Sequence, residues 1–168
     1  MFLILIWIKI TFSAATLAVL SWWIQPHRKD HFRFNQSAVL QGLVSAGLLY
    51  AIFWLGKTIS GTLMPFAATQ INGIYQKGMG THTAIIAALL FFITGPCEEI
   101  YWRGFLQKNL AARFGPWQGW LLATVIYAAV HIWSFNLMLI GAAGVAGAFW
   151  GAMFWRYNNL APVIISHS

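Results

Sequence analysis

Acidic side chains are nearly missing from this sequence of 168 residues, which has three aspartates and glutamates against ten lysines and arginines. Charged residues of both signs make up 8% of the chain, whereas hydrophobic residues make up 60% and aromatic residues 17%. In a water-soluble globular domain about a quarter of the residues are charged. The shortage of charge excludes a soluble domain of this size and predicts an integral membrane protein.

Cysteine occurs once, at Cys97, so an intrachain disulfide is excluded. A basic segment ahead of the first apolar run is also missing, and Lys9 interrupts that run. We therefore interpret residues 1–24 as containing a spanning helix rather than a cleaved signal peptide. The ten basic residues occur singly or in loops, without a basic face, so we expect no nucleic-acid partner despite the formal net charge of +7.

The basic residues are better interpreted as topology signals. Most of them fall in three loops, near residues 25–37, 108–117 and 155–159, while Lys57 and Lys77 lie in the alternate loop. The positive-inside rule then places the three loops in the cytoplasm and the amino terminus outside. Short loops and a basic cytoplasmic face are typical of a multi-pass protein of the bacterial plasma membrane.

Apolar segments of about 20 residues, enough to cross the hydrocarbon core, recur along the chain. We expect an all-α, polytopic bundle of about six spans that forms one domain over residues 1–168. The expected spans cover residues 2–24, 38–56, 83–107, 117–135 and 137–155, with a sixth beginning at Leu160. Residues 59–80 are mildly apolar and contain proline and several glycines, which predicts a re-entrant or surface-lying piece.

A pair of small residues marks the fifth expected span. Gly147 and Gly151 form a GxxxG pair, a spacing that lets helix backbones approach closely in lipid. We interpret the pair as close packing within the bundle. An oligomer interface is the alternative, and the oligomeric state stays open.

Glutamate occurs only at Glu98 and Glu99, side by side within the apolar residues 91–104. A carboxylate near the bilayer centre costs on the order of 3 kcal/mol, so this pair indicates function. On a helix, Glu99 and Arg103 are four residues apart and can form an ion pair. Glu98 lies about 100° around the helix and stays free to exchange a proton. The alternative is a buried ion-pair network that only fixes helix packing.

Two histidines are expected at the depth of this acid. Glu98, His131 and His167 each lie ten or eleven residues from a marker of the cytoplasmic interface on the same expected helix. At 1.5 Å per residue, each side chain is about 15 Å deep, near the midplane of the bilayer. Three spans therefore bring an acid and two histidines to one level, which predicts a site.

Together these residues resemble a known family, the CAAX prenyl endopeptidase and bacteriocin-processing (CPBP, or Abi) family of intramembrane proteases. The stretch "EEIYWRG" is similar to its first motif and contains Glu98, Glu99 and Arg103. The stretch "YAAVH", with Tyr127 and His131, resembles the second motif, and "NNLAPVIISHS" resembles the third. The resemblance covers about residues 85–168.

The resemblance implies hydrolysis of a peptide bond in a membrane-associated or CAAX-like substrate, without a cofactor. Carried over to this sequence, Glu98 is the general base that activates water and His131 is its partner. His167 would help to bind the oxyanion, and Glu99 and Arg103 would hold the helix, with Tyr127 in support. The expected partners are a peptide or membrane-protein substrate and the lipid bilayer.

One departure from the family pattern concerns the third motif. That motif normally ends in an asparagine four residues beyond its histidine, whereas this sequence has one residue after His167. We therefore expect that the chain is truncated within the last motif, with an inactive relative that lacks this group as the alternative.

Two other functions stay open. Glu98, Glu99, His131 and His167 are the residue types that bind zinc, so a zinc-dependent metalloprotease is one alternative, although no HExxH motif is present. In that case Glu98, His131 and His167 are the expected ligands and Glu99 is the base. The other alternative is a non-catalytic membrane scaffold or immunity protein.

Overall fold

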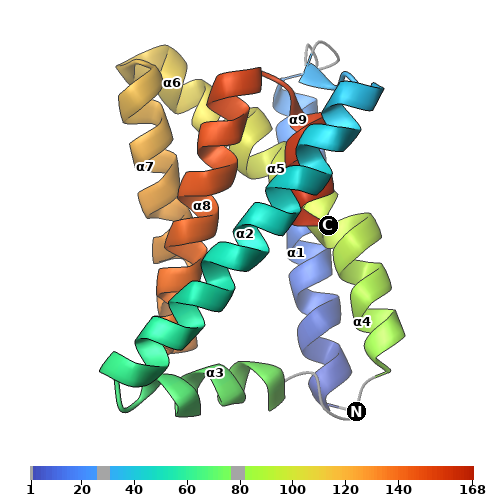
Figure 1. Ribbon diagram of the computed structural model, residues 1–168. Helices are drawn as coiled ribbons and strands as arrows, with labels where there is room; N and C mark the ends of the chain where they lie inside the picture. The colour runs from blue at the N-terminus through green and yellow to red at the C-terminus, as the bar shows by residue number, and fades with distance from the viewer. Residues whose placement is uncertain (1, 26–30, 77–81) are drawn as a thin grey trace.

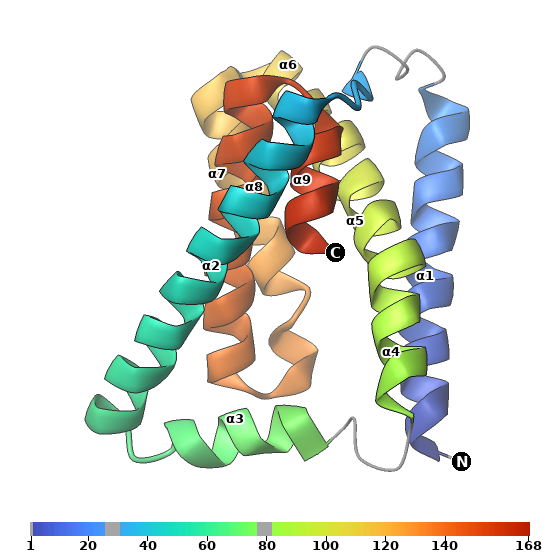
Figure 2. The same ribbon diagram turned by 45° about the vertical axis from the view of Figure 1, so that its right-hand side comes forward.

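The computed structural model describes residues 2–25, 31–76 and 82–168, with side chains from Trp7 onward. The basic residues Arg28, Lys29 and Lys77, which the topology prediction uses, lie outside the described residues. The described part of the chain is helical and contains no strand, as expected for an all-α membrane protein (Figures 1 and 2). In chain order the helices are α1 (Phe2–Ile24), α2 (Gln36–Leu63), α3 (Ala67–Gln76), α4 (Thr83–Leu89), η2 (Leu90–Thr94), α5 (Gly95–Tyr101), η3 (Trp102–Gln107), α6 (Lys108–Phe114), α7 (Pro116–Ala129), η4 (Ile132–Ser134), α8 (Leu137–Tyr157) and α9 (Leu160–His167).

Four helical segments of the described chain are long and apolar enough to cross a membrane. They are Trp7–Ile24 in α1, the whole of α2, the continuous run Thr83–Phe114 and the whole of α8. The count of about six spans is not confirmed, because α7 has 14 residues and α9 has eight. These two helices are shorter than the roughly 20 residues that a crossing requires.

The fourth expected span, residues 117–135, is not one helix. α7 ends at Ala129, and a short 3₁₀ helix, η4, follows at Ile132–Ser134. Phe135 then adopts a left-handed backbone with φ 50°, and the side chain of Asn136 accepts the backbone N–H of Leu139 to cap α8. This turn chemistry separates α7 from α8, which the hydrophobicity of the segment alone did not indicate.

Of the expected re-entrant or surface-lying segment, residues 59–80, the described part forms the end of α2 and a separate helix, α3. α3 runs across the lower ends of α2 and α8 in both views, rather than along them (Figures 1 and 2). Gln70 ties it to the start of α8, because its carbonyl accepts Asn136 Nδ2 at 2.8 Å and its Oε1 accepts the N–H of Met138 at 3.0 Å. The described part of the segment is thus a helix packed across the ends of α2 and α8, and its description as a re-entrant or surface-lying piece stays a prediction.

Two π-helical segments interrupt the third span on either side of the glutamates. η2 ends where the N–H of Gly95 donates to the carbonyl of Leu90, five residues earlier. Pro96 follows directly and has no N–H to continue the hydrogen-bond ladder of the helix. The second π segment, η3, begins three residues after Glu99. π-Helical turns are rare and occur frequently at functional sites.

The three loops assigned to the cytoplasm share one end of the bundle. The backbone N–H of Arg33 donates to Asn159 Oδ1 at 3.0 Å, and Asn159 Nδ2 donates back to the carbonyl of Arg33 at 2.9 Å. Lys108 Nζ lies 2.8 Å from His31 Nε2, which joins the first of these loops to the second. Lys57, which was expected in the alternate loop, lies instead within α2, with its Nζ over the ring of Tyr75 in α3. The grouping that the charge pattern predicts is therefore present in the described part of the chain.

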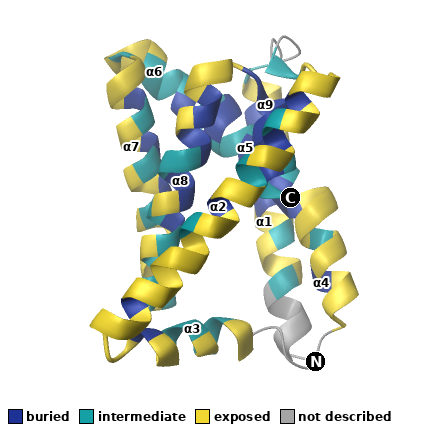
Figure 3. Ribbon diagram, in the orientation of Figure 1, coloured by how far each residue is buried: buried dark blue, intermediate teal, exposed yellow. Residues whose placement is uncertain are grey.

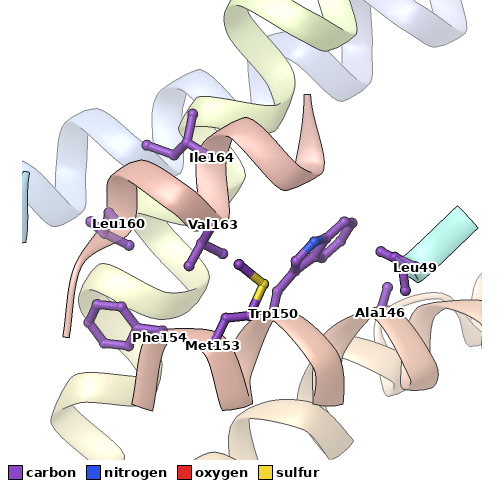
Figure 4. Packing of buried hydrophobic residues seen from close by; sticks show 8 residues of the cluster. All are labelled: Leu49, Ala146, Trp150, Met153, Phe154, Leu160, Val163 and Ile164. Carbon is purple, nitrogen blue, oxygen red and sulfur yellow. The ribbon is translucent and has the colours of Figure 1, made fainter. Parts of the chain in front are cut away.

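The core lies where α2, α8 and α9 meet (Figure 4). α9 is short and almost completely buried, with Leu160, Ala161 and Val163 at 0% exposure. In contrast, the outer faces of α1, α2 and α4 are largely exposed (Figure 3), and on α2 they carry large apolar side chains such as Leu40, Leu43 and Trp54. An apolar surface of this extent fits contact with lipid. The core residues are Leu49, Ala146, Trp150, Met153, Phe154, Leu160, Val163 and Ile164.

Candidate active site

Glu99 is a fully buried carboxylate with two nitrogen partners on one oxygen. Arg103 Nη1 donates to Glu99 Oε1 at 2.8 Å, across one turn of helix, as the spacing of the two residues predicts. Arg103 is itself buried, and its Nη2 also donates to the carbonyl of Gly147 in α8 at 3.3 Å. The ion pair therefore links the third span to α8.

The second partner of Glu99 is His167 at the end of α9. Its Nδ1 lies 2.6 Å from Glu99 Oε1, and the two residues are 68 positions apart in the sequence. A bond of this kind sets the tautomer of the imidazole, because Nδ1 carries the proton that it donates to the carboxylate, and it leaves Nε2 outside the contact. Among the described residues, the other oxygen, Glu99 Oε2, is buried without a hydrogen-bond partner.

Glu98 occupies a different environment from its neighbour. It is half-buried, and its Oε2 accepts the hydroxyl of Tyr127 in α7 at 3.1 Å. Because adjacent residues on a helix point about 100° apart, one glutamate faces α9 and the other faces α7. The two carboxylates thus belong to separate hydrogen-bond groups although they are neighbours in sequence.

His131 lies in the turn that follows α7, rather than in the middle of a span as expected. Its Nδ1 is 2.8 Å from the carbonyl of Tyr127, and its ring meets the Tyr127 ring edge-on, with centroids 5.2 Å apart. Tyr127 therefore holds Glu98 through its hydroxyl and His131 through its backbone. In the part of the chain that the structure describes, no hydrogen bond joins His131 directly to Glu98 or to His167.

Arg103 connects the two groups. Its guanidinium carbon lies 4.8 Å from the centre of the Tyr127 ring and 5.4 Å from the centre of the Trp150 ring. Cation–π contacts at these distances are favourable, more so when the groups are removed from water. The residues of the first and second motifs are in this way packed around one buried cation.

Two residues of this region have no role in the sequence analysis. Trp150 stacks on His167 with ring centroids 3.8 Å apart and planes 18° from parallel. Gln107 is buried, and its Nε2 donates to the carbonyl of Gly151 at 2.8 Å. A spacing of four residues places three polar side chains on one face of the helix: Glu99, Arg103 and Gln107. This spacing is a signal in the sequence that would have identified Gln107. The contact of Trp150 depends on where α9 packs, which no local pattern indicates.

The small residues of α8 allow this close packing. A Cβ atom on Gly147 would lie 3.0 Å from Tyr127 Cδ1, and one on Gly151 would lie 2.8 Å from Trp120 Cδ1 and 2.9 Å from Gln107 Oε1. The GxxxG pair therefore faces inward, against α7 and η3, which agrees with its interpretation as packing within the bundle. The same approach brings the Gly147 and Gly151 carbonyls to Arg103 and Gln107.

The expected zinc ligands are distributed over both groups. Glu98 is bonded to Tyr127, and each histidine uses Nδ1 in a hydrogen bond and keeps Nε2 outside it. Within the described residues, no three histidine, cysteine, aspartate or glutamate side chains are arranged so that they could hold a metal ion. Cys97, next to Glu98, is half-buried and has a free thiol.

A family model described as "Type II CAAX prenyl endopeptidase Rce1-like" matches residues 80–168, which is more than half of the chain. The matched region begins just before α4 and contains Glu98, Glu99, Arg103, Tyr127, His131 and His167. Comparisons with curated proteins and with solved structures found no match.

Proposed function

The chain belongs to the type II CAAX prenyl endopeptidase Rce1-like family, and on that premise we propose that it is an intramembrane endopeptidase in which Glu98 activates the attacking water. Membership supports a membrane-embedded protease, and the four apolar helices support insertion in a bilayer. The substrate that we propose is a peptide or protein held at the membrane, with a CAAX-like carboxyl terminus as the first class to test. The cytoplasmic loops would be those that carry Arg33, Lys108 and Arg156.

The observation that carries this proposal is the contrast between the two glutamates. Glu99 is 0% exposed and engaged with Arg103 and His167, so it has neither the access to water nor the freedom that a general base needs. Glu98 is half-buried and bonded to one neutral hydroxyl, so a water molecule can reach it. A base must come within hydrogen-bond reach of the proton that it removes, and of the two glutamates only Glu98 has exposed surface that a water molecule could approach.

In the proposed reaction, the Glu98 carboxylate removes a proton from water while the water oxygen adds to the carbonyl carbon of the scissile peptide. The C–N bond then breaks, and the proton on Glu98 passes to the leaving amine, which restores the carboxylate. The Tyr127 hydroxyl holds Glu98 in place through the 3.1 Å hydrogen bond. His131 Nε2, outside the bond to the Tyr127 carbonyl, is available as a second contact for the water.

The negative charge that develops on the carbonyl oxygen needs a hydrogen-bond donor. His167 donates Nδ1–H to Glu99, and when the imidazole is protonated its Nε2–H is a second donor that can serve this role. The proposal thus gives Glu99 a supporting role, in which it orients the histidine through the bond to Nδ1, while Arg103 keeps the carboxylate in position.

The test compares the purified protein with its Glu98→Gln variant on fluorogenic peptides, including farnesylated CAAX peptides, with products identified by mass spectrometry. We expect cleavage by the unmodified protein and incorporation of ¹⁸O from labelled water into the new carboxyl group. We expect Glu98→Gln to lower the rate about 10²- to 10⁴-fold, the usual contribution of a general base, with the thermal unfolding temperature unchanged. Arg113→Gln, which removes an exposed charge, is the matched control. Cleavage by Glu98→Gln at the unmodified rate would show that another group activates the water.

A further inference from the structure

Trp150 is a buried aromatic residue in α8 that lies flat on His167. The indole is 6% exposed, and its ring centroid is 3.8 Å from that of the imidazole, with an angle of 18° between the planes. α8 supplies Trp150 and α9 supplies His167, so the contact joins two helices. In this geometry the indole lies against one face of the imidazole.

The indole is held in place from several directions. Its Nε1 donates to Ser166 Oγ at 3.2 Å, on the same helix as His167. Its ring belongs to the core that also contains Leu49, Ala146 and Met153. Trp150 therefore cannot turn without breaking a buried hydrogen bond and disturbing the core packing.

The bond from His167 to Glu99 does not fix the imidazole by itself. A single contact at Nδ1 restrains the position of that atom, but small rotations about the Cα–Cβ and Cβ–Cγ bonds can still tilt the plane of the ring. The flat indole face removes that freedom, because rotation would drive the imidazole into Trp150. The Trp150 ring also contacts the guanidinium of Arg103, whose carbon is 5.4 Å from the ring centre. Arg103 and His167, the two partners of Glu99, therefore both pack against Trp150.

We propose that Trp150 is a positioning residue for the reaction, which sets the plane of the His167 imidazole and hence the direction in which Nε2 faces. This inference rests on the proposed function, in which Nε2–H of His167 serves the developing oxyanion. Donors aimed at a transition-state charge act only at the correct angle, so a mobile imidazole loses rate rather than substrate affinity. A misplacement of about 1 Å can lower a rate about 10²-fold.

The predicted kinetic effects follow from the two contacts of the indole. Trp150→Leu removes the stack, and we expect kcat to fall about 10- to 100-fold with KM within about twofold of the unmodified value. Trp150→Phe keeps an aromatic face and removes the N–H, so it should retain most of the rate that Trp150→Leu loses. Ser166→Ala removes only the hydrogen bond that orients the indole, and its effect should be smaller still.

A spectroscopic measurement tests the positioning independently of catalysis. The chain has five histidines, so protein labelled with ¹³C and ¹⁵N on histidine gives five sets of ring resonances in detergent, and His167→Gln identifies the set of His167. An indole stacked at 3.8 Å shields the imidazole protons, which places their signals upfield. We expect Trp150→Leu to abolish this shift and Trp150→Phe to reduce it, because a phenyl ring has the smaller ring current.

The matched control is Trp120→Leu, the same substitution at an indole that donates to the Ala148 carbonyl and packs on Trp117. It should leave the His167 signals in place. If Trp150→Leu does not fold, Trp150→Phe still tests whether Trp150 orients His167. A His167 signal that does not move in Trp150→Phe, or that moves no more than in Trp120→Leu, overturns the proposal. A shifted signal with unchanged kcat overturns it as well. If the unmodified protein cleaves no peptide, the proposed function fails, while the resonances still report whether Trp150 orients His167.

Discussion

Glu99 and His167 meet at 2.6 Å although 68 residues separate them in the sequence. The contact joins the first motif to the third and connects α5, in the third span, with the end of α9. It also shows that the two glutamates have different partners. The one that forms the helical ion pair with Arg103 also orients a histidine, while its neighbour Glu98 faces Tyr127. Glu99 is thus buried and bonded to Arg103 and His167, whereas Glu98 is partly exposed.

The buried ion pair should be essential for stability. Glu99→Gln leaves Arg103 as a buried charge without its counterion, and breaking such a pair costs about 3–5 kcal/mol of the free energy of unfolding. Arg103→Met should cost less, because Glu99 keeps His167 as a partner. Tryptophan fluorescence during denaturation in mixed micelles measures both values, and a Glu99→Gln protein as stable as the unmodified one contradicts the prediction.

The two substitutions should also be strongly non-additive. The double variant with Glu99→Gln and Arg103→Met removes both charges, so we expect it to be more stable than Glu99→Gln alone. We expect it to remain inactive, because His167 then lacks the carboxylate that orients it. Recovered stability without recovered cleavage separates the structural role of the pair from its role in the proposed reaction.

Tyr127→Phe tests the link between α7 and the proposed base. The substitution removes the hydroxyl that donates to Glu98 Oε2 and keeps the ring that packs against Arg103 and His131. We expect a loss of about 1 kcal/mol in stability and a fall of about tenfold in kcat, as for one hydrogen bond to a reacting group. Tyr101→Phe is the control, since that ring packs on Trp102 and Phe105. Equal losses in the two variants would rule out a specific role for the Tyr127 hydroxyl.

The sequence was sufficient for the parts of the site that depend on local helical geometry. A spacing of four residues predicted the Glu99–Arg103 pair, and the small residues of α8 predicted a close approach of helices, because both follow from 3.6 residues per turn. The partner of His167 did not follow, since it depends on how α9 rotates and packs against α5. An argument from depth in the membrane cannot distinguish Glu98 from Glu99, which differ by 1.5 Å along the axis.

The number of spans was also not predicted well from the sequence, since four helical segments of the described chain are long and apolar enough to cross a membrane, where about six were expected. Hydrophobicity extends through residues 117–135, but the helix ends at Ala129, because Phe135 and Asn136 form a turn and a cap whose signals are only a few residues long. The two π-helical segments beside the glutamates were not predicted from the sequence. Each π turn adds a residue to the turn and so changes which side chains face α7 and α9.

Gly147 should tolerate no side chain. A Cβ atom at this position meets Tyr127 Cδ1 at 3.0 Å, so Gly147→Ala should push α7 from α8 and weaken the contacts of Tyr127 with Glu98 and Arg103. We expect a loss of about 1–3 kcal/mol in stability, together with reduced cleavage. Gly141→Ala is the control on the same helix, because a Cβ atom there has nothing within 4 Å. Denaturation curves that fail to distinguish the two variants would contradict this packing account.

Chelation decides between water activated by Glu98 alone and water bound to zinc. Both histidines use Nδ1 in protein contacts and keep Nε2 outside them, so the imidazoles alone fit either mechanism. The carboxylates favour the first: Glu99 Oε1 is shared by Arg103 and His167, Glu98 Oε2 accepts the Tyr127 hydroxyl, and within the described residues no three histidine, cysteine, aspartate or glutamate side chains are placed to hold a metal ion. We therefore expect cleavage to survive incubation with 1,10-phenanthroline, with a known zinc protease inhibited in parallel. Activity that is lost on chelation and restored by zinc, but not by magnesium, would assign Glu98, His131 and His167 as ligands and move the role of base to Glu99.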